Sequence, residues 1–486
     1  MVNTPVIIGT IVVYMGVCLF LGYAAWRRTH NLADFILGGR SLGSWVTAFS
    51  AQASDMSGWL LMGLPGLAYL AGFDAVWMIA GLIAGTWLNW RFIAAPLRTR
   101  TEQLGNALTL PDYFERRFDD RSRVLRTLTA FFILVFFTFY TSSGFVATGR
   151  LFESLFGISY LESMFWGSLV MLAYTFFGGF LAVSWSDVLQ GTLMFIALVL
   201  VAAFGVVHLG GPGEMSAALD ARNSALLEPF LGSDGQALGW IGVVSLLAWG
   251  LGYPGQPHIL ARFMAARSAA EIPPARRVAM VWVIVVLVAA VIVGLAGVLL
   301  LDPPLAGPDS EKVFIRLATT FLHPVLAGIC LSGILAAIMS TAAAQLLVAS
   351  SAFAQDFYKG LFRRDPGRAE LLWVGRLAVL AIALLAFLLA TNPDSKVLDL
   401  VAWAWAGFGA AFGPAIVLSL YWPRMTRNGA LAGIIVGGLT VILWKQGSGP
   451  IFALYEMLPG VVFATLAIWI VSRAGAREPV AAPAEL

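Results

Sequence analysis

The residues best suited to chemistry are polar side chains set inside long apolar stretches. Asp55 is the only charged residue between Arg40 and Asp74, and Ser, Gln and Gly residues surround it. A carboxylate at the centre of a membrane helix costs about 2.5–3.5 kcal/mol, so Asp55 needs a partner. No Lys or Arg is near in sequence, which indicates either a bound cation or the positive end of a half-helix that starts near Ser57. The alternative is that Ser54 or Asp55 only caps that half-helix.

A second polar group lies in the apolar run 325–354. Ala337, Ser340 and Thr341 follow i, i+3, i+4 spacing, so a helix places them on one face. Two hydroxyl oxygens, with carbonyls freed by a break near 53–56, would give about five neutral oxygens. That ligand set suits a monovalent cation such as sodium. The open alternative is a small-residue packing seam whose hydroxyls bond back to their own helix.

The elements that must position these residues are broken membrane helices. Residues 49–59 contain three Ser, a Gln, an Asp and a Gly, and residues 249–257 contain three Gly and two Pro. Gly and Pro weaken a helix, so both segments are expected to unwind or kink. Each opens a set of five spans, and an odd number inverts the second set relative to the first. Interrupted helices at matching places of inverted halves predict the binding site of a secondary transporter.

The remaining chain has the composition of a membrane protein. The 486 residues are 59% hydrophobic and 12% charged, about half the charged fraction of a soluble protein. About thirteen apolar stretches of membrane-spanning length predict an all-α protein. We place them near 6–26, 44–70, 75–95, 124–152, 160–181, 187–209, 236–256, 277–301, 325–354, 372–391, 398–421, 429–446 and 450–472.

Several functional classes are excluded by the same features. The low charge argues against a soluble enzyme and a nucleic-acid binder. Cys18 and Cys330 lie in apolar runs, and the four His residues are scattered, so neither type has metal-site spacing. No phosphate-binding glycine loop of the Walker A type occurs, which argues against ATP as the driving force. We therefore do not expect an enzyme.

The distribution of positive charge predicts the orientation and the organisation of the chain. Placing the N-terminus outside and the C-terminus inside puts most Arg and Lys residues in cytoplasmic loops. We expect a first helix and inner loop, a first five-helix repeat, an outer loop, a second inverted repeat, and two final helices with a cytoplasmic tail. These parts cover residues 1–43, 44–210, 211–235, 236–421 and 422–486, respectively.

Three strings in the chain resemble a known family. The runs Ser54–Gly66, Gly178–Gly191 and Ala337–Gln345 are similar to those of the bacterial sodium/proline symporters within the sodium:solute symporter family. The resemblance extends from about residue 5 to 472. It implies a thirteen-helix fold with a LeuT-like core of two inverted five-helix repeats, each opening with a broken helix. It also implies sodium-coupled uptake of L-proline across the bacterial cytoplasmic (inner) membrane.

The resemblance further implies roles for individual residues. Sodium would be held by three carbonyl and two hydroxyl oxygens, with Asp55 in support, and proline would lie against small and aromatic residues. The implied sodium ligands are Ala53, Met56, Ala337, Ser340 and Thr341, and the implied substrate residues are Ser57, Gly58, Tyr140, Trp249 and Tyr253. Arg40 and Asp187 match positions with indirect roles. Their plainer interpretations are an inner-face anchor for Arg40 and a cap of the sixth span for Asp187.

The substrate prediction has a chemical basis and one departure from the family pattern. Trp249 and Tyr253 are four residues apart, so a helical backbone would place both rings on one face. Aromatic walls suit the pyrrolidine ring, and backbone amides at a half-helix N-terminus suit a carboxylate. Pro254 departs from the family pattern, where an aromatic residue is expected. The alternatives are a carrier of a proline analogue or betaine, a solute sensor built on a transporter fold, and a channel.

Overall fold

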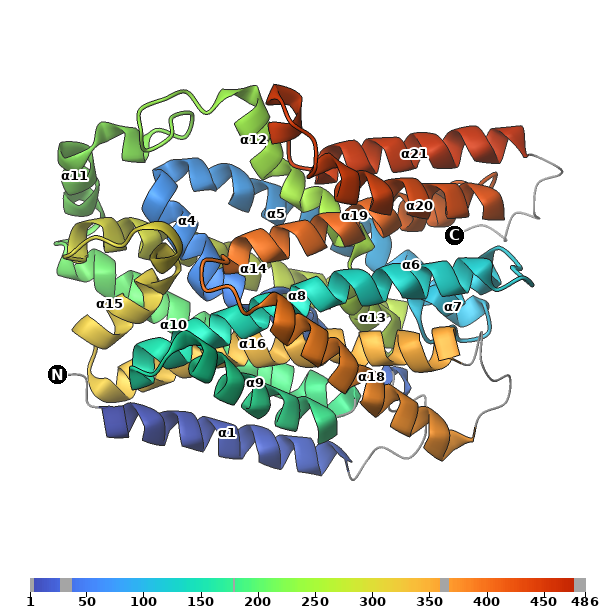
Figure 1. The fold of residues 1–486 in the computed structure, drawn as a ribbon, viewed down its shortest axis with the longest axis horizontal. Coiled ribbons are helices and arrows are strands. Elements are labelled where there is room, and N and C mark those ends of the chain that lie inside the picture. Colours follow the sequence, from blue (N-terminus) through green and yellow to red (C-terminus); the bar gives the residue numbers. More distant parts are fainter. Residues whose placement is uncertain (1–3, 27–36, 178–179, 359–366, 476–486) are drawn as a thin grey trace.

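The computed structural model describes residues 4–26, 37–177, 180–358 and 367–475. Within these ranges the chain is a bundle of helices, and most of them run side by side along one direction (Figure 1). In lipid each backbone N–H and C=O must be paired within the protein, which a helix achieves by itself. Long apolar side chains on the outside of the bundle remain exposed, including Leu377, Leu384 and Leu443. Such a surface is expected where lipid is the solvent.

Eight helical stretches of the described residues are long and apolar enough to cross a membrane. Two shorter apolar helices, Pro5–Leu21 and Trp373–Leu389, have a similar composition. The membrane character predicted from composition is therefore seen in the elements themselves.

The first part of the chain contains the first broken helix. α1 (Thr4–Trp26) lies at one edge of the bundle, at the bottom of Figure 1. The next elements are α3 (Ser44–Asp55), the π-helical turn η2 (Trp59–Gly63), α4 (Leu64–Ala71), α5 (Val76–Leu88), a second π-helical turn η4 (Asn89–Ile93), α6 (Ala94–Gln103), α7 (Leu110–Arg117), α8 (Val124–Phe156), α9 (Tyr160–Phe177) and α10 (Phe180–His208). Residues 178–179, which begin one of the family-like strings, lie outside the described residues.

The second part begins after a connection that holds α11 (Pro212–Arg222). Its elements are α12 (Gly239–Leu247), the 3₁₀ segment η6 (Ala248–Gly255), α13 (Pro257–Ala265), α14 (Ile272–Leu300), η8 (Gly307–Lys312), α15 (Val313–Phe321), α16 (Pro324–Ser351), the π-helical turn η9 (Ala352–Tyr358), α18 (Arg368–Leu389) and α19 (Val397–Tyr421). α15 is a short helix that precedes α16. The last helices are α20 (Arg427–Trp444) and α21 (Met457–Ala474), joined through η10 (Pro450–Ala453).

Glycine allows η6, in the second broken region, to pack closely against α5. A Cβ at Gly85 in α5 would lie 2.2 Å from the Gly250 carbonyl oxygen in η6. A Cβ at Gly250 would in turn lie 2.1 Å from the Gly81 carbonyl oxygen. Because real Cβ contacts are never this short, the approach of η6 to α5 depends on these glycines.

Candidate ion and substrate site

The first predicted break is present between α3 and α4. Helix α3 ends at Asp55, and Met56 has φ −84° and ψ 82°, which is not helical. The Met56 N–H still bonds the Gln52 carbonyl, whereas the Ser57 N–H bonds only two residues back, to the Asp55 carbonyl. The regular ladder therefore stops here, and the carbonyl of Ala53 is free to face another helix.

Helix α16 supplies the partner of that carbonyl. The Ser340 hydroxyl donates to the Ala53 carbonyl at 2.7 Å, and the Thr341 hydroxyl donates to the same oxygen at 3.2 Å. The Ser340 hydroxyl oxygen is also 3.1 Å from the Ala337 carbonyl oxygen. Four of the five oxygens predicted to hold sodium are thus brought together, although Ala53 and Ser340 are 287 residues apart in sequence.

The α16 hydroxyls bond to another helix as well as within their own. Both reach across to α3, so the alternative in which they bond only within their own helix is wrong. Met56, the remaining predicted ligand, lies in the break itself and is fully buried. A hydroxyl rotates freely about its C–O bond and can turn a lone pair toward a cation instead of donating to a carbonyl. The donor set is neutral and compact, which fits one monovalent ion.

Asp55 is buried beside this cluster without a hydrogen-bonded partner. Its side chain is fully buried, and neither carboxylate oxygen makes a hydrogen bond within the described residues. Its main-chain carbonyl, in contrast, accepts from the Tyr140 hydroxyl at 3.3 Å and the Trp59 indole N–H at 3.2 Å. A buried carboxylate is costly without a compensating charge, so this group favours a nearby cation.

The capping alternative for Ser54 and Asp55 is wrong. The Ser54 hydroxyl donates back to the Ala51 carbonyl within α3, and the Asp55 carboxylate bonds no N–H of the following helix. The side chain that does meet the start of the next half-helix is Ser57, whose hydroxyl accepts from the Trp59 N–H at 3.4 Å. The turn geometry after Met56, rather than a cap, therefore leaves Asp55 in the interior.

The predicted substrate residues surround the two breaks. The Tyr253 side chain is close enough to Asp55 and Tyr140 to interact with both electrostatically. The Trp249 ring centroid is 6.3 Å from that of Trp59 in η2. The geometry therefore joins the aromatic residues of α8 and η6 to the polar break of α3.

The rings of Trp249 and Tyr253 do not lie on one face, although an α-helical backbone would place them there. Residues 248–255 form a 3₁₀ segment, which has three residues per turn, so positions four apart diverge. Accordingly Trp249 contacts Trp59, whereas the Tyr253 ring lies edge-on to Trp405, 5.0 Å between centroids. The Trp405 indole N–H also donates to the Trp249 carbonyl at 2.8 Å. Trp405 in α19 is a component of this region that sequence reasoning missed.

Gly58 has a packing explanation that the sequence did not reveal. A Cβ at this position would lie 2.9 Å from the Ala147 Cβ of α8 and 3.3 Å from an Ile338 carbon of α16. Gly58 therefore allows α8 and α16 to approach the break from two sides.

Arg40 bonds to several elements at the ends that the sequence predicts to be cytoplasmic. Its guanidinium donates to the Thr101 hydroxyl at 3.2 Å, the Met264 carbonyl at 3.1 Å and the Ala107 carbonyl at 3.0 Å. Burial, together with the nearby Arg98 charge, lowers the pKa of Arg40 to about 10. The contacts agree with the anchoring interpretation and join Arg40 to α6 and α13.

Asp187 belongs to a buried charge cluster rather than to a helix cap. It lies inside α10, which already begins at Phe180 within the described residues, so the capping interpretation is wrong. The Ser50 hydroxyl donates to its carboxylate at 2.7 Å, and the Arg262 guanidinium is 3.5 Å from the same oxygen. The Arg262 Nε–H also donates to the Ser50 hydroxyl at 3.2 Å. This cluster links α3, α10 and α13.

Sequence reasoning missed Arg262 as the partner of Asp187. The helix α13 extends from Pro257 to Ala265 and carries Arg262 into the interior, where its side chain is fully buried. The five-residue distance from Pro257, which starts a helix, could have placed Arg262 on α13.

The loop that contains η8 is bonded to α8 and α19 through Glu311. The Glu311 carboxylate accepts the N–H groups of Val397 and Leu398 at the start of α19, at 2.9 and 3.0 Å. It also pairs with Arg150 of α8 at 3.2 Å. Burial raises the pKa of Glu311 even though Arg150 and the two N–H groups act in the opposite direction. These contacts join the loop to α8 and α19.

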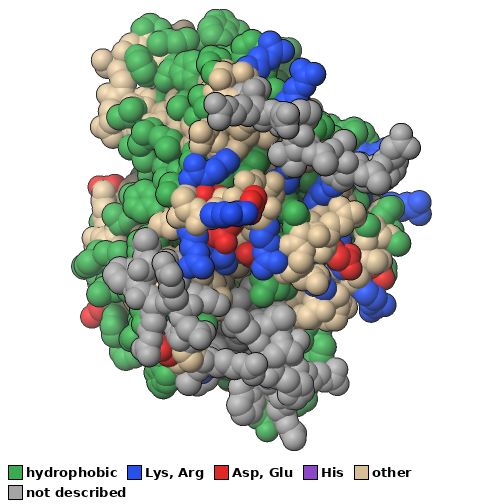
Figure 2. Space-filling view, turned by 90° about the vertical axis from the view of Figure 1, so that its right-hand side faces the viewer, with side chains coloured by type: hydrophobic (Ala, Val, Ile, Leu, Met, Phe, Trp, Pro, Cys, Tyr) green, Lys and Arg blue, Asp and Glu red, His purple; other side chains and the backbone are tan. Residues whose placement is uncertain are grey.

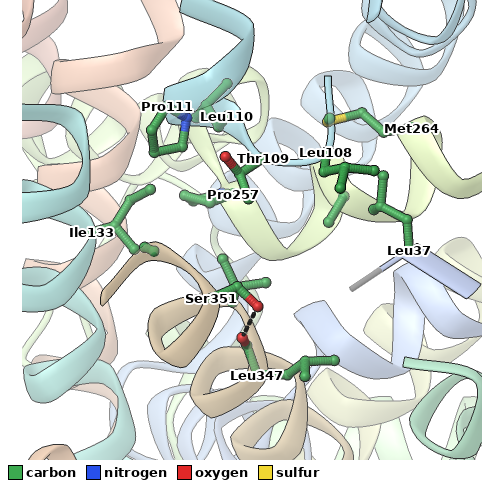
Figure 3. Close-up of a pocket in the computed structure, with 13 residues that line it drawn as sticks. Leu37, Leu108, Thr109, Leu110, Pro111, Ile133, Pro257, Met264, Leu347 and Ser351 are labelled. Atoms are coloured by element: carbon green, nitrogen blue, oxygen red, sulfur yellow. Dashed lines mark hydrogen bonds between the residues drawn. The ribbon is translucent and has the colours of Figure 1, made fainter. Parts of the chain in front are cut away.

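An apolar cavity lies between α8, α13 and α16, beside the start of α7 (Figure 3). Its walls come from α7, α8, α13 and α16, and Ile133, Pro257, Leu347 and Ser351 point into it. None of the predicted ion or substrate residues lines it. Leu347 and Ser351 follow Thr341 on α16, so the cavity lies further along the same helix.

Basic side chains gather at the end of the bundle where α7 lies. Figure 2 views this end and shows Lys and Arg side chains around several Asp and Glu residues. Ion pairs among the helix ends include Arg126 with Asp356 at 2.6 Å and Arg427 with Asp120 at 2.7 Å.

Comparison with known proteins decides the family. A profile of the Sodium:solute symporter family matches residues 35–437. The chain belongs to the sodium:solute symporter family. The chain is 51% identical to a sodium/proline symporter of Salmonella typhimurium, over all of this chain and 96% of that protein. It is 50% identical to a sodium/proline symporter of Escherichia coli, over 98% of this chain and 94% of the relative. It is 49% identical to a high-affinity proline transporter of Bacillus subtilis, over 93% of this chain and 95% of that relative.

Two solved transporter structures have a similar fold. A substrate-bound, outward-open Na⁺-coupled sialic acid symporter superposes with a TM-score of 0.80 at 20% identity, covering 97% of this chain and 98% of that one. A nucleobase-cation-symport-1 transporter in a closed conformation gives 0.53 at 14% identity, covering 92% and 96%. At these identities the likeness concerns the fold alone.

Proposed function

We propose that this protein is a secondary active transporter that couples the entry of sodium to the uptake of L-proline across the bacterial cytoplasmic membrane. The observation that carries the proposal is the meeting of Ser340 and Thr341 with the Ala53 carbonyl, at a helix break that also carries Asp55 and Ser57. The full-length identity of about 50% to sodium/proline symporters supports the choice of substrate.

The sodium ion binds where α3 is interrupted. Its ligands are the carbonyls of Ala53, Met56 and Ala337 and the hydroxyls of Ser340 and Thr341. The Asp55 carboxylate, buried without a hydrogen-bonded partner, supplies the balancing negative charge. Because α3 and α16 each provide ligands, a bound ion holds the two helices together.

Proline lies next to the ion, against Ser57, Gly58, Tyr140, Trp249 and Tyr253. Its carboxylate interacts with N–H groups at the start of the half-helix after the break, where the backbone is positive. Its apolar ring packs against the aromatic side chains. Sodium shapes this pocket by fixing the backbone of the break, which links the two cargoes.

The architecture that we propose has thirteen membrane helices. Two inverted five-helix repeats form the core, and the broken units α3–η2–α4 and α12–η6–α13 open them. They occupy residues 44–210 and 236–421, around the outer loop 211–235. Residues 1–43 form an additional helix with an inner loop, and residues 422–486 form two helices with the tail. The basic end of Figure 2 is cytoplasmic, which places the N-terminus outside and the C-terminus inside.

Transport proceeds by alternating access. Sodium binds first, proline follows, the outer side closes, and the site then opens to the cytoplasm. The apolar cavity between α8, α13 and α16 lies on the inward side of the site and provides the start of a release route. No covalent chemistry is needed.

The sodium gradient supplies enough free energy for accumulation. One charge moving through ~100 mV gives about 2.3 kcal/mol. A tenfold concentration gradient of sodium adds about 1.4 kcal/mol. Together they sustain roughly a 500-fold proline gradient at one-to-one coupling.

The test is uptake of radiolabelled proline by proteoliposomes that contain the purified protein. We expect accumulation above the outside concentration only with an inward sodium gradient, and competition by proline above other amino acids. Equilibration without accumulation would identify a channel. Stronger competition by a betaine or another N-substituted analogue would favour that substrate, and binding without uptake would favour a sensor.

A further inference from the structure

A tyrosine from the C-terminal part of the chain stands against the predicted substrate residue Trp249. Tyr455 lies in the turn between η10 and α21, and its ring is stacked on the Trp249 indole, with centroids 5.5 Å apart and planes 20° apart. Trp249 also contacts Trp59 through a tilted arrangement. Its side chain is buried between these neighbours, with 6% of its surface exposed.

Tyr455 is itself held in place by two other elements. Its hydroxyl donates to the Ala402 carbonyl of α19 at 2.7 Å, and its backbone N–H donates to the Ser245 hydroxyl of α12 at 2.9 Å. Two residues further on, Met457 packs against Gly409 so closely that a Cβ there would lie 2.5 Å from the Met457 sulfur. The tyrosine ring is therefore a fixed support rather than a mobile surface group.

The remaining freedom of Trp249 is the orientation of its indole. The backbone is fixed independently, because the Trp405 indole N–H bonds the Trp249 carbonyl. In a 3₁₀ segment side chains three residues apart lie over one another, and the residue three after Trp249 is Gly252, which has no side chain. Rings from other elements therefore decide the plane of the indole. Tyr455 provides the nearly parallel neighbour.

We propose that Tyr455 is a positioning residue for substrate recognition: its ring sets the plane of the Trp249 indole that forms one wall of the substrate pocket. This inference rests on the proposed function. It gives the C-terminal segment, which lies outside both five-helix repeats, a part in substrate selection. An indole held in one plane defines the width of the slot available to a five-membered ring, and a freed indole admits larger rings.

The test compares Tyr455→Leu, which removes the ring, with Tyr455→Phe, which keeps the stack and loses only the hydroxyl bond. Equilibrium binding of labelled proline to purified protein in saturating sodium gives the affinity without requiring fast transport. An aromatic pair contributes about threefold to tenfold in an equilibrium constant beyond its buried area. We expect Tyr455→Leu to weaken proline binding by about that factor, and Tyr455→Phe by less than twofold. We also expect Tyr455→Leu to reduce the preference for proline over its six-membered homologue pipecolate.

A structural role alone would give a different pattern. Trp444→Phe is the matched control, because the Trp444 indole N–H bonds the Leu454 carbonyl of the same turn at 3.0 Å while its ring packs on Phe452. The control should leave proline affinity unchanged, and Tyr455→Leu should leave the half-saturating sodium concentration unchanged. In a Trp249→Leu background, Tyr455→Leu should have no further effect, because the group that it positions is gone.

Several results would overturn the inference. They are an unchanged proline affinity in Tyr455→Leu, an equal loss in Trp444→Phe, an equal shift in sodium affinity, or fully additive losses in the double variant. If the wild type binds another amino acid or a betaine and does not bind proline, the proposed substrate is wrong. The same comparison made with that solute still tests the role of Tyr455.

Discussion

The sharpest prediction concerns the two hydroxyls of α16. In the structure Ser340 and Thr341 meet the same carbonyl, Ala53, and both are buried. Replacing either residue with alanine (Ser340→Ala, Thr341→Ala) removes one of five proposed sodium ligands. A bond to a charged partner contributes about 1.5–3 kcal/mol, and 1.4 kcal/mol is a factor of ten. Each single variant should therefore raise the half-saturating sodium concentration by about 10- to 150-fold, and the double variant should raise it further.

The assay is proline uptake into proteoliposomes as a function of external sodium, at a fixed membrane potential. Ser332→Ala is the matched control, because Ser332 is buried on the same helix and its hydroxyl bonds only the Gly328 carbonyl, at 2.8 Å. The control loses a comparable hydrogen bond but no proposed ligand, so its sodium dependence should be that of the wild type. Unchanged sodium dependence in the Ser340 and Thr341 variants would refute the proposed ion site. An equal shift in Ser332→Ala would show that the effect comes from α16 packing.

Three further outcomes follow from other contacts. Asp55→Asn should abolish sodium-driven uptake. It should leave the protein at least as heat-stable as the wild type, because the change removes a buried charge that has no hydrogen-bonded partner. Wild-type uptake by this variant would contradict the proposed role. Gly85→Ala should reduce the folded amount in the membrane, because its Cβ would lie 2.2 Å from the Gly250 carbonyl oxygen, and size-exclusion chromatography of matched detergent extracts checks this. Burial acts to raise the pKa of Asp120, but bonds from Ser122, the Leu125 N–H and Arg427 outweigh it and lower the pKa below its usual value. The stabilisation that Asp120 provides is therefore present above its unfolded pKa of about 3.9 and lost as pH falls through the lower folded value. Thermal unfolding between pH 3 and 7 should show a smaller loss at acidic pH in Asp120→Asn than in the wild type, and an identical loss in both would exclude the contribution.

The elements of the fold could be predicted from local sequence because lipid imposes local requirements. A span needs a run of apolar residues about as long as the bilayer is thick, and Gly, Pro and clustered polar residues interrupt a helix wherever they occur. The end of α3 at Asp55 and the irregular segment 248–257 are therefore visible in the residues themselves. The same holds for the i, i+3, i+4 face of Ala337, Ser340 and Thr341.

Some local interpretations failed because a neighbour in space decided the outcome. Asp187 has the residue type of a cap, but Arg262 and Ser50 reach it from two other helices. Ser54 and Asp55 are also residue types that cap helices, but the turn after Met56 directs neither side chain to the next helix. The side chains of Trp249 and Tyr253 point in different directions because residues 248–255 form a 3₁₀ rather than an α-helical segment. Gly250 of this segment packs closely on α5.

The sequence by itself determined that the chain crosses a membrane, where two of its helices are interrupted, and which polar side chains are placed at those interruptions. These properties follow from the transfer of each residue into lipid and from the backbone geometry of Gly and Pro, which act within a few residues. Only the tertiary structure decided that the hydroxyls of α16 meet the Ala53 carbonyl, that Arg262 pairs with Asp187, and that Tyr455 stacks on Trp249. Those contacts join residues that are 75 to 288 positions apart, and their formation depends on how closely whole helices pack.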